Sequence, residues 1–143
     1  MKTETLFSSA SSEWETPQWL FDSLDSEFHF TLDAAASDQN HKCEKYYTVS
    51  DNALKRPWGR STFVNPPFGR GVDKWVEKAA AECRGGGSTV VMLLPARTDT
   101  QWFHRWIYHR HEVRFMNGRI KFGGSKNNAP FPTMIVIMRG ESK

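Results

Sequence analysis

The sequence contains few of the features that mark secreted or membrane proteins. Only two cysteines, Cys43 and Cys83, occur in 143 residues, too few for a disulfide framework. The longest apolar runs cover a few residues, as at positions 90–94, far short of the roughly 20 residues of a membrane-spanning helix. The first residues are polar and lack the apolar stretch of a signal peptide. We therefore expect a reduced, cytoplasmic protein with no membrane segment.

Motifs for metal or phosphate binding are also missing. His104, His109 and His111 lie close together in the sequence, but no tetrahedral ligand set accompanies them. Three glycines at positions 85–87 follow a predicted helix instead of opening one, and no Lys-Ser/Thr pair follows them. We therefore expect no metal site, and we interpret the three glycines as a helix stop.

Charge is distributed unevenly along the chain, although the net charge is only +3. Residues 1–60 carry 6 Lys and Arg against 10 Asp and Glu, whereas residues 61–143 carry 13 against 6. A basic half suits a polyanion such as nucleic acid, and a solvated surface of uneven charge is the alternative. The length fits a single domain. We place it at residues 14–143, after a Ser- and Thr-rich lead-in at residues 1–13.

Alternating helix and strand patterns predict an α/β fold. Thr16 can cap a helix over residues 17–26 with Pro17 at its first position. An apolar stripe predicts a second helix from residue 72 to the glycines, and Thr98 and Asp99 can cap a third. Strands are predicted at residues 28–33, 46–49, 61–64, 89–94, 112–122 and 132–138. This order predicts a compact three-layer α/β domain, with a mostly parallel sheet and an antiparallel edge.

Polar residues follow several of the predicted strands. Asp33, Asp51 and Asn65 each come directly after a strand, and Pro95 ends another. Ligands of open α/β sheets bind beyond the carboxyl ends of the strands. We therefore expect these residues to lie on one rim, which is where a ligand would bind.

The stretch Asn65-Pro66-Pro67-Phe68 is the most informative on this rim. The two prolines end the strand and stiffen the backbone. They hold the Asn65 side chain and the Pro66 carbonyl in fixed directions, so two acceptors can receive both hydrogens of an exocyclic amino group. Phe68 can supply a flat face for the ring that carries this amine. An ordinary strand-ending turn is the alternative interpretation.

Together with other segments, this stretch resembles the phage-type DNA adenine-N6 methyltransferase family, whose members use S-adenosylmethionine. The similarity runs from about residue 14 to residue 138. The other matching segments are Glu15-Thr16-Pro17, Leu32-Asp33-Ala34-Ala35-Ala36, Ser50-Asp51-Asn52-Ala53-Leu54 with Trp58, Leu94-Pro95-Ala96-Arg97, Gly118-Arg119-Ile120-Lys121-Phe122-Gly123-Gly124 and Ala129-Pro130-Phe131-Pro132.

The resemblance implies a Rossmann-like methyltransferase fold and a mechanism. Methyl transfer from S-adenosylmethionine to adenine N6 in DNA would be direct, without a metal, on an adenine flipped out of the duplex. Residues 65–68 would act in catalysis, with Phe68 stacking on the base. The cofactor would contact Thr16, Pro17, Asp33, Asp51 and Asn65, with Asp51 accepting from its adenine amine.

A basic group of side chains near the end of the chain suits the DNA backbone. Arg97, Arg119, Lys121 and Lys126 are its candidate phosphate contacts. Arg119 and Lys121 alternate on a predicted strand and would share one face. A solvated basic face is the alternative interpretation.

Several functions remain open from the sequence. The same Asn-Pro-Pro-Phe logic serves cytosine N4, adenine in RNA and glutamine amides in proteins. The turn after Asp33 has no glycine, so a non-catalytic DNA-binding remnant of the fold is a second alternative. A single-strand-binding module with stacked aromatic rings is a third. The sequence defines neither the target site in DNA nor the oligomeric state.

Overall fold

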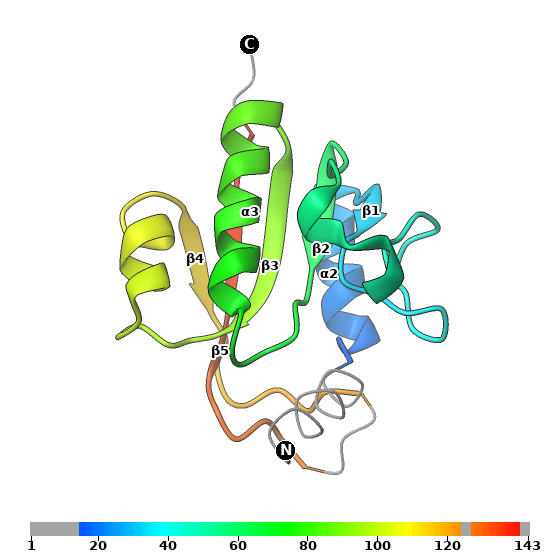
Figure 1. Ribbon diagram of the computed structural model, residues 1–143. Helices are drawn as coiled ribbons and strands as arrows, with labels where there is room; N and C mark the ends of the chain where they lie inside the picture. Colours follow the sequence, from blue (N-terminus) through cyan, green and yellow to red (C-terminus); the bar gives the residue numbers. More distant parts are fainter. Residues whose placement is uncertain (1–14, 124–126, 141–143) are drawn as a thin grey trace.

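The computed structural model describes residues 15–123 and 127–140. The predicted lead-in at residues 1–13 and the predicted phosphate contact Lys126 lie outside them. The described chain forms a sheet with helices on both sides (Figure 1). Within these residues, no helix combines the length and the apolar character needed to cross a membrane.

The sheet is mixed, as the sequence predicts. Its strand order is β1-β2-β3-β5-β4. Strands β1 (Leu32–Asp33), β2 (Ser61–Val64) and β3 (Thr89–Pro95) run parallel. Strand β5 (Thr133–Met138) runs antiparallel to β3, and β4 (Glu112–Phe115) runs antiparallel to β5. The carboxyl ends of β1, β2 and β3 therefore lie at the same end of the sheet.

Each face of the sheet carries its own apolar layer, which confirms the three-layer arrangement. Helix α3 (Val72–Gly86) and the π-helical turn η3 (Phe103–Ile107) cover one face, and α2 (Gln18–Phe28) covers the other (Figure 1). The paired residues Met92 and Val136 face α3, whereas the next pair, Val91 and Ile137, faces α2. Strand β3 is thus buried on both faces.

Helix α3 forms where the apolar stripe predicts it. Its buried positions recur at helical spacing, so one face packs on the sheet. The helix runs on through Gly85 and Gly86 and ends at Gly87, which takes the left-handed conformation with φ +70°. The predicted glycine stop therefore falls on the last of the three glycines. The buried residues are Val72, Val76, Ala79, Ala80 and Cys83.

Two predicted strands on the amino-terminal side are wrong over most of their length. Residues 28–33 form a strand only at Leu32–Asp33, because Phe28 still belongs to α2 and His29 ends that helix with φ +52°. Residues 46–49 contribute a single bridge between Tyr46 and Asp33. The chain then tightens into two 3₁₀ helices, η1 (Val49–Asp51) and η2 (Ala53–Lys55).

Two predictions in the second half also change. The strand predicted over residues 112–122 ends at Phe115, because the chain bends at Gly118, where φ is +86°. The cap predicted at Thr98 and Asp99 is wrong, since the Phe103 N–H donates to Oγ1 of Thr100 instead. The turn that follows is the π-helical η3.

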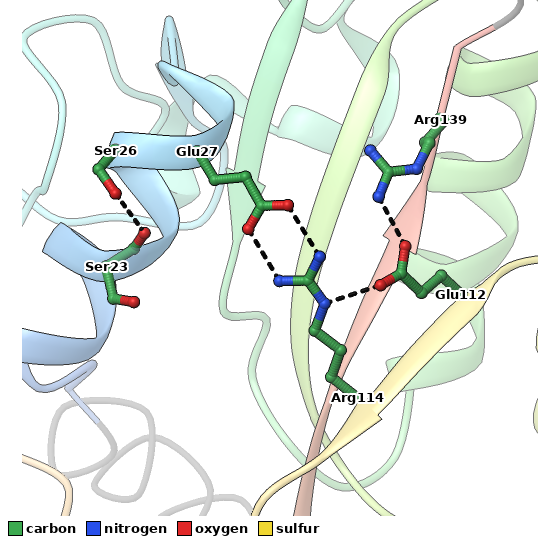
Figure 2. A network of polar contacts seen from close by, with 6 residues as sticks. All are labelled: Ser23, Ser26, Glu27, Glu112, Arg114 and Arg139. Atoms are coloured by element: carbon green, nitrogen blue, oxygen red, sulfur yellow. Dashed lines mark hydrogen bonds and ion pairs between the residues drawn. The ribbon is translucent and has the colours of Figure 1, made fainter.

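A network of ion pairs ties α2 to the antiparallel side of the sheet (Figure 2). Arg114 of β4 donates two hydrogen bonds to the Glu27 carboxylate, at 2.9 and 2.8 Å, and one to Glu112 at 2.8 Å. Arg139 donates to the other oxygen of Glu112 at 2.6 Å. The Arg114 hydrogen bonds lower the pKa of both glutamates. The Arg114 side chain therefore stabilises the packing of α2 against the sheet.

Candidate active site

A cavity of about 890 Å³ lies where the first two parallel strands end. This volume is in the usual range for sites that bind small molecules. Its walls come from the residues before α2, the turn after β1, the two 3₁₀ helices, the end of β2 and the first turn of α3. The residues that matter for the argument below are Thr16, Asp33, Asn52, Phe63, Asn65 and Trp75.

Asn65 lies directly after β2, on the wall of this cavity. All four residues of β2 are buried, so the strand fixes the direction in which the next residue leaves the sheet. Pro66 is buried and Pro67 lines the cavity. Neither proline has a backbone N–H to extend the sheet, which is why the strand ends here. The predicted position of Asn65 at the rim is confirmed.

Thr16 contacts Asn65 although 49 positions separate them in the sequence. Nδ2 of Asn65 donates a hydrogen bond to Oγ1 of Thr16 at 2.9 Å, and Thr16 is buried. The predicted role of Thr16 as a helix cap is wrong. Pro17 occupies the N-cap position, with φ −59° and ψ 140°, and α2 begins at Gln18. The Thr16 hydroxyl is therefore available to the site.

Asp33 stands at the end of β1 and lines the cavity. The side chain is buried and accepts the backbone N–H of Lys42 at 2.9 Å and that of Ala35 at 3.4 Å. Burial raises the pKa of Asp33 above its usual 3.8, and the two hydrogen bonds partly oppose this rise. The carboxylate thus closes the turn after β1, in a residue that lines the cavity.

Asp51 differs from its predicted setting, because no strand precedes it. It ends η1, and its carboxylate accepts the N–H of Thr48 at 2.8 Å and the Thr48 hydroxyl at 3.2 Å. This is a capping box, with the carboxylate turned back on the helix start. Thr48 and Asn52 line the cavity, whereas Asp51 itself is not among the lining residues. Its contact with a cofactor stays a prediction.

Phe68 is packed inside the protein. Its ring is 9% exposed and meets the rings of Phe122 and Phe131 edge-on, at centroid distances of 6.0 and 5.4 Å. It belongs to the apolar layer on the α2 face and does not line the cavity. The stacking of Phe68 on a substrate base stays a prediction, and it requires this ring to gain access to the cavity.

Most of the cavity lining was not predicted as site residues, and three of these residues have side chains suited to binding. Asn52 takes the left-handed conformation with φ +57°, which asparagine tolerates better than most residues. Lys42 lines the cavity and donates from Nζ to Gln18 at 2.9 Å. Trp75 is partly buried, packs against the core on the α3 face and also lines the cavity. The sequence signal for Trp75 was its position in the first turn of the helix that follows Asn-Pro-Pro-Phe.

Arg97, Arg119 and Lys121 are all exposed, and none of them lines the cavity. Arg119 and Lys121 lie beyond the end of β4 and not on a strand, so their predicted alternation on a strand is wrong; both are exposed, and Ile120 between them is buried. Their segment then joins the region of the site, since Gly123 donates its N–H to the Glu15 carbonyl at 2.8 Å. Two exposed cations therefore lie on a segment that is attached next to Thr16.

The described residues, 15–123 and 127–140, bear on metal binding and on thiol chemistry. In that part of the chain, no three His, Cys, Asp or Glu side chains are grouped as a metal site. Cys43 and Cys83 are not joined in a disulfide, and burial raises the pKa of Cys43 to about 12. That thiol is therefore protonated at neutral pH and is a weak nucleophile.

The fold and the site define an α/β domain with a small-molecule cavity at the carboxyl ends of its parallel strands. The model of the DNA N-6-adenine-methyltransferase (Dam) family matches residues 3–142, so the chain belongs to this family. The family resemblance predicted from the sequence is thereby confirmed.

Two relatives agree with this assignment. Over 93 residues, the chain is 41% identical to the DNA N-6-adenine-methyltransferase of Escherichia phage T1. The aligned region covers 63% of the chain and 38% of that relative. Over 64 residues, it is 36% identical to the Escherichia coli K12 protein named "Putative methyltransferase YfdM", covering 39% of the chain and 70% of that protein. The match thus spans well under half of the phage T1 enzyme.

Proposed function

We propose that this protein transfers a methyl group from S-adenosylmethionine to the N6 amino group of adenine in DNA. The observation that carries the proposal is the position of Asn65, at the end of β2 and on the wall of a cavity of about 890 Å³. Membership of the Dam family and the name of the phage T1 relative support the choice of adenine and of DNA.

The amine of adenine is a weak nucleophile, because its lone pair is delocalised into the ring. We propose that Oδ1 of Asn65 and the carbonyl of Pro66 accept its two hydrogens. These acceptors favour the positive charge that develops on nitrogen during the reaction, which is electrostatic preorganisation. Holding the amine in one place also reduces the entropy that the reaction must lose. No residue needs to act as a strong base.

The residues around the cavity fit S-adenosylmethionine. The buried Asp33 carboxylate suits a ligand that carries positive charge, Asn52 offers hydrogen bonds, and the Trp75 ring offers an apolar and cation-attracting face. When bound, S-adenosylmethionine supplies an electrophilic methyl group on its sulfonium. Thr16, Pro17 and Asp51 remain proposed cofactor contacts, of which Thr16 lines the cavity.

DNA would approach from the side of the exposed cations. We propose that Arg97, Arg119 and Lys121 contact phosphates, and we retain Lys126 in this group from the sequence. An adenine inside a duplex cannot reach the cavity, so the base would flip out at a cost of a few kcal/mol. Phosphate contacts position the duplex, whereas the site selects the base.

We also propose that residues 14–143 form one catalytic domain of the Rossmann-like type. The three parallel strands, the helical layers on both faces and the site at the carboxyl ends of the strands support this proposal. With DNA as substrate, the protein would act in the cytoplasm of a bacterial host.

The test is transfer of labelled methyl from S-adenosylmethionine to unmethylated duplex DNA, followed by digestion to nucleosides. We expect the label on N6-methyldeoxyadenosine, and we expect Asn65→Ala to abolish it while the melting temperature stays close to that of the wild type. Asn117→Ala, which changes an exposed asparagine beyond β4, is the matched control and should stay active. Label on cytosine, or a wild type that labels no DNA, would refute the proposal.

A further inference from the structure

The amide of Asn65 has two different ends, and only one of them suits the proposed chemistry. Its oxygen Oδ1 accepts hydrogen bonds, whereas its nitrogen Nδ2 only donates. An amine that must give up hydrogens to an acceptor would be repelled by Nδ2. A half-turn of the amide would exchange the two ends with little change of shape, so catalysis needs a group that fixes the amide's direction.

Thr16 is placed to do this. Nδ2 of Asn65 donates to Oγ1 of Thr16 at 2.9 Å, and Thr16 is only 4% exposed. With Nδ2 directed at Thr16, Oδ1 lies on the opposite side of the amide carbon. Both residues line the cavity, so this orientation is set at the point where a substrate amine would arrive.

Thr16 is itself held from both sides. The carbonyl of Glu15 accepts the N–H of Gly123 at 2.8 Å. The carbonyl of Pro17 accepts the N–H groups of Leu20 and Phe21, each at 3.1 Å, which anchors it to the first turn of α2. The backbone on either side of Thr16 therefore has little freedom, and the hydroxyl keeps its position.

The distance between Thr16 and Asn65 is fixed by packing between α2 and β2. The Phe21 ring meets the Phe63 ring edge-on, with centroids 5.3 Å apart and planes at 82°. Both rings are buried, at 4% and 1% exposure, and Phe63 precedes Asn65 by two residues. The packing of α2 on the sheet thus places the Thr16 hydroxyl at the end of β2.

We propose that Thr16 is a positioning residue, whose hydroxyl fixes the Asn65 amide with Oδ1 toward the substrate amine. This inference rests on the proposed function. It differs from a cofactor contact in what it affects: loss of a cofactor contact raises the KM for S-adenosylmethionine, whereas loss of the orientation lowers kcat.

The first test compares Thr16→Val with Thr16→Ser. Valine keeps the shape but removes the hydroxyl, and we expect kcat to fall roughly 10- to 100-fold, as for a misplaced catalytic group. Because Thr16 is also a proposed cofactor contact, the KM for S-adenosylmethionine can rise as well, but the fall in kcat should persist at saturating S-adenosylmethionine, and the melting temperature should stay close to wild type. Serine restores the hydroxyl and should restore kcat. A Thr16→Val enzyme with wild-type kcat, or a raised KM with kcat unchanged, would overturn the inference.

The second test uses Asn65→Asp, because a carboxylate has two equivalent oxygens and no wrong orientation. Adding Thr16→Val to Asn65→Asp should lower kcat much less than adding it to the wild type. An equal loss in both backgrounds would mean that Thr16 acts through general structure and not through the amide.

A third measurement does not depend on turnover. The side-chain NH₂ signals of Asn65 in an ¹⁵N-correlated NMR spectrum, assigned by their loss in Asn65→Asp, should shift in Thr16→Val and not in Thr16→Ser. Unchanged signals in Thr16→Val would exclude the hydrogen bond. A wild type that methylates no adenine would instead refute the proposed function, whatever the spectra show.

Discussion

Removing the two exposed cations beside the site should change how DNA binding depends on salt. Arg119 and Lys121 are both exposed, on either side of the buried Ile120. Their segment is joined to Glu15, next to Thr16. We therefore expect each to neutralise one phosphate, and the double variant Arg119→Ala/Lys121→Ala should lose both contacts.

The size of the effect follows from counterion release. Each phosphate contact contributes about 0.9 to the slope of log affinity against log salt, so two contacts contribute about 1.8. Between about 50 and 200 mM salt, the affinity advantage of the wild type over the double variant should therefore shrink about 12-fold. Fluorescence anisotropy with a labelled duplex, titrated at several salt concentrations, measures both slopes directly.

A charge-matched control distinguishes phosphate contacts by Arg119 and Lys121 from a general effect of positive charge on DNA binding. Arg60 precedes β2 and Arg84 lies in the last turn of α3, so both are exposed at the opposite end of the parallel strands. Arg60→Ala/Arg84→Ala should leave the salt slope nearly unchanged. Equal slopes for the wild type and Arg119→Ala/Lys121→Ala, or equal losses in both double variants, would refute the reasoning.

Four further substitutions test the stability of the fold. Gly85→Ala should raise the free energy of unfolding by about 0.5–1 kcal/mol, because its Cβ would meet nothing within 4 Å in a helix. Gly140→Ala should lower the free energy of unfolding by at least ~2 kcal/mol, since its Cβ would overlap the carbonyl of Gly87. Chemical denaturation measures the free energy of unfolding of both variants. A more stable Gly140→Ala than Gly85→Ala would contradict the packing. The raised pKa of Asp33 means that its contribution to stability is greatest below pH 3.8 and is lost as the pH rises through the folded-state pKa. The melting temperature of Asp33→Asn relative to wild type should therefore increase with pH, and a flat difference would argue against the buried carboxyl. Arg114→Ala should lower the melting temperature, more at low than at high salt, because it breaks the network in Figure 2; an equal loss at both salt concentrations would exclude an electrostatic cause.

The patterns that depend on near neighbours in the sequence predicted their elements well. Helix α3 forms because apolar residues recur at helical spacing up to Gly87. Strands β2 and β3 form where short stretches of strand-forming residues lie between turn residues. The position of Asn65 follows equally locally, since two prolines end β2 directly after it. These features depend on backbone geometry over a few residues, and neighbouring residues in the sequence determine that geometry.

The errors fall where distant contacts compete with local preference. Residues 46–49 are rich in strand formers, yet only Tyr46 finds a partner on the edge strand β1. The chain then turns into η1, where Asp51 caps the helix start instead of following a strand. Strand propensity predicts a strand only where a neighbour is present to pair with it.

The sequence by itself determined the α/β class, the family and the residue at the rim on which the proposed chemistry depends. The tertiary structure decided which residues meet there. Thr16 looked like a helix cap, because Ser, Thr and Asp before a helix usually are caps. Packing of Phe21 on Phe63 instead brings its hydroxyl to Asn65, across 49 positions of sequence. Patterns of neighbouring residues cannot predict such a contact, because it forms only once two separate elements bury their apolar faces together.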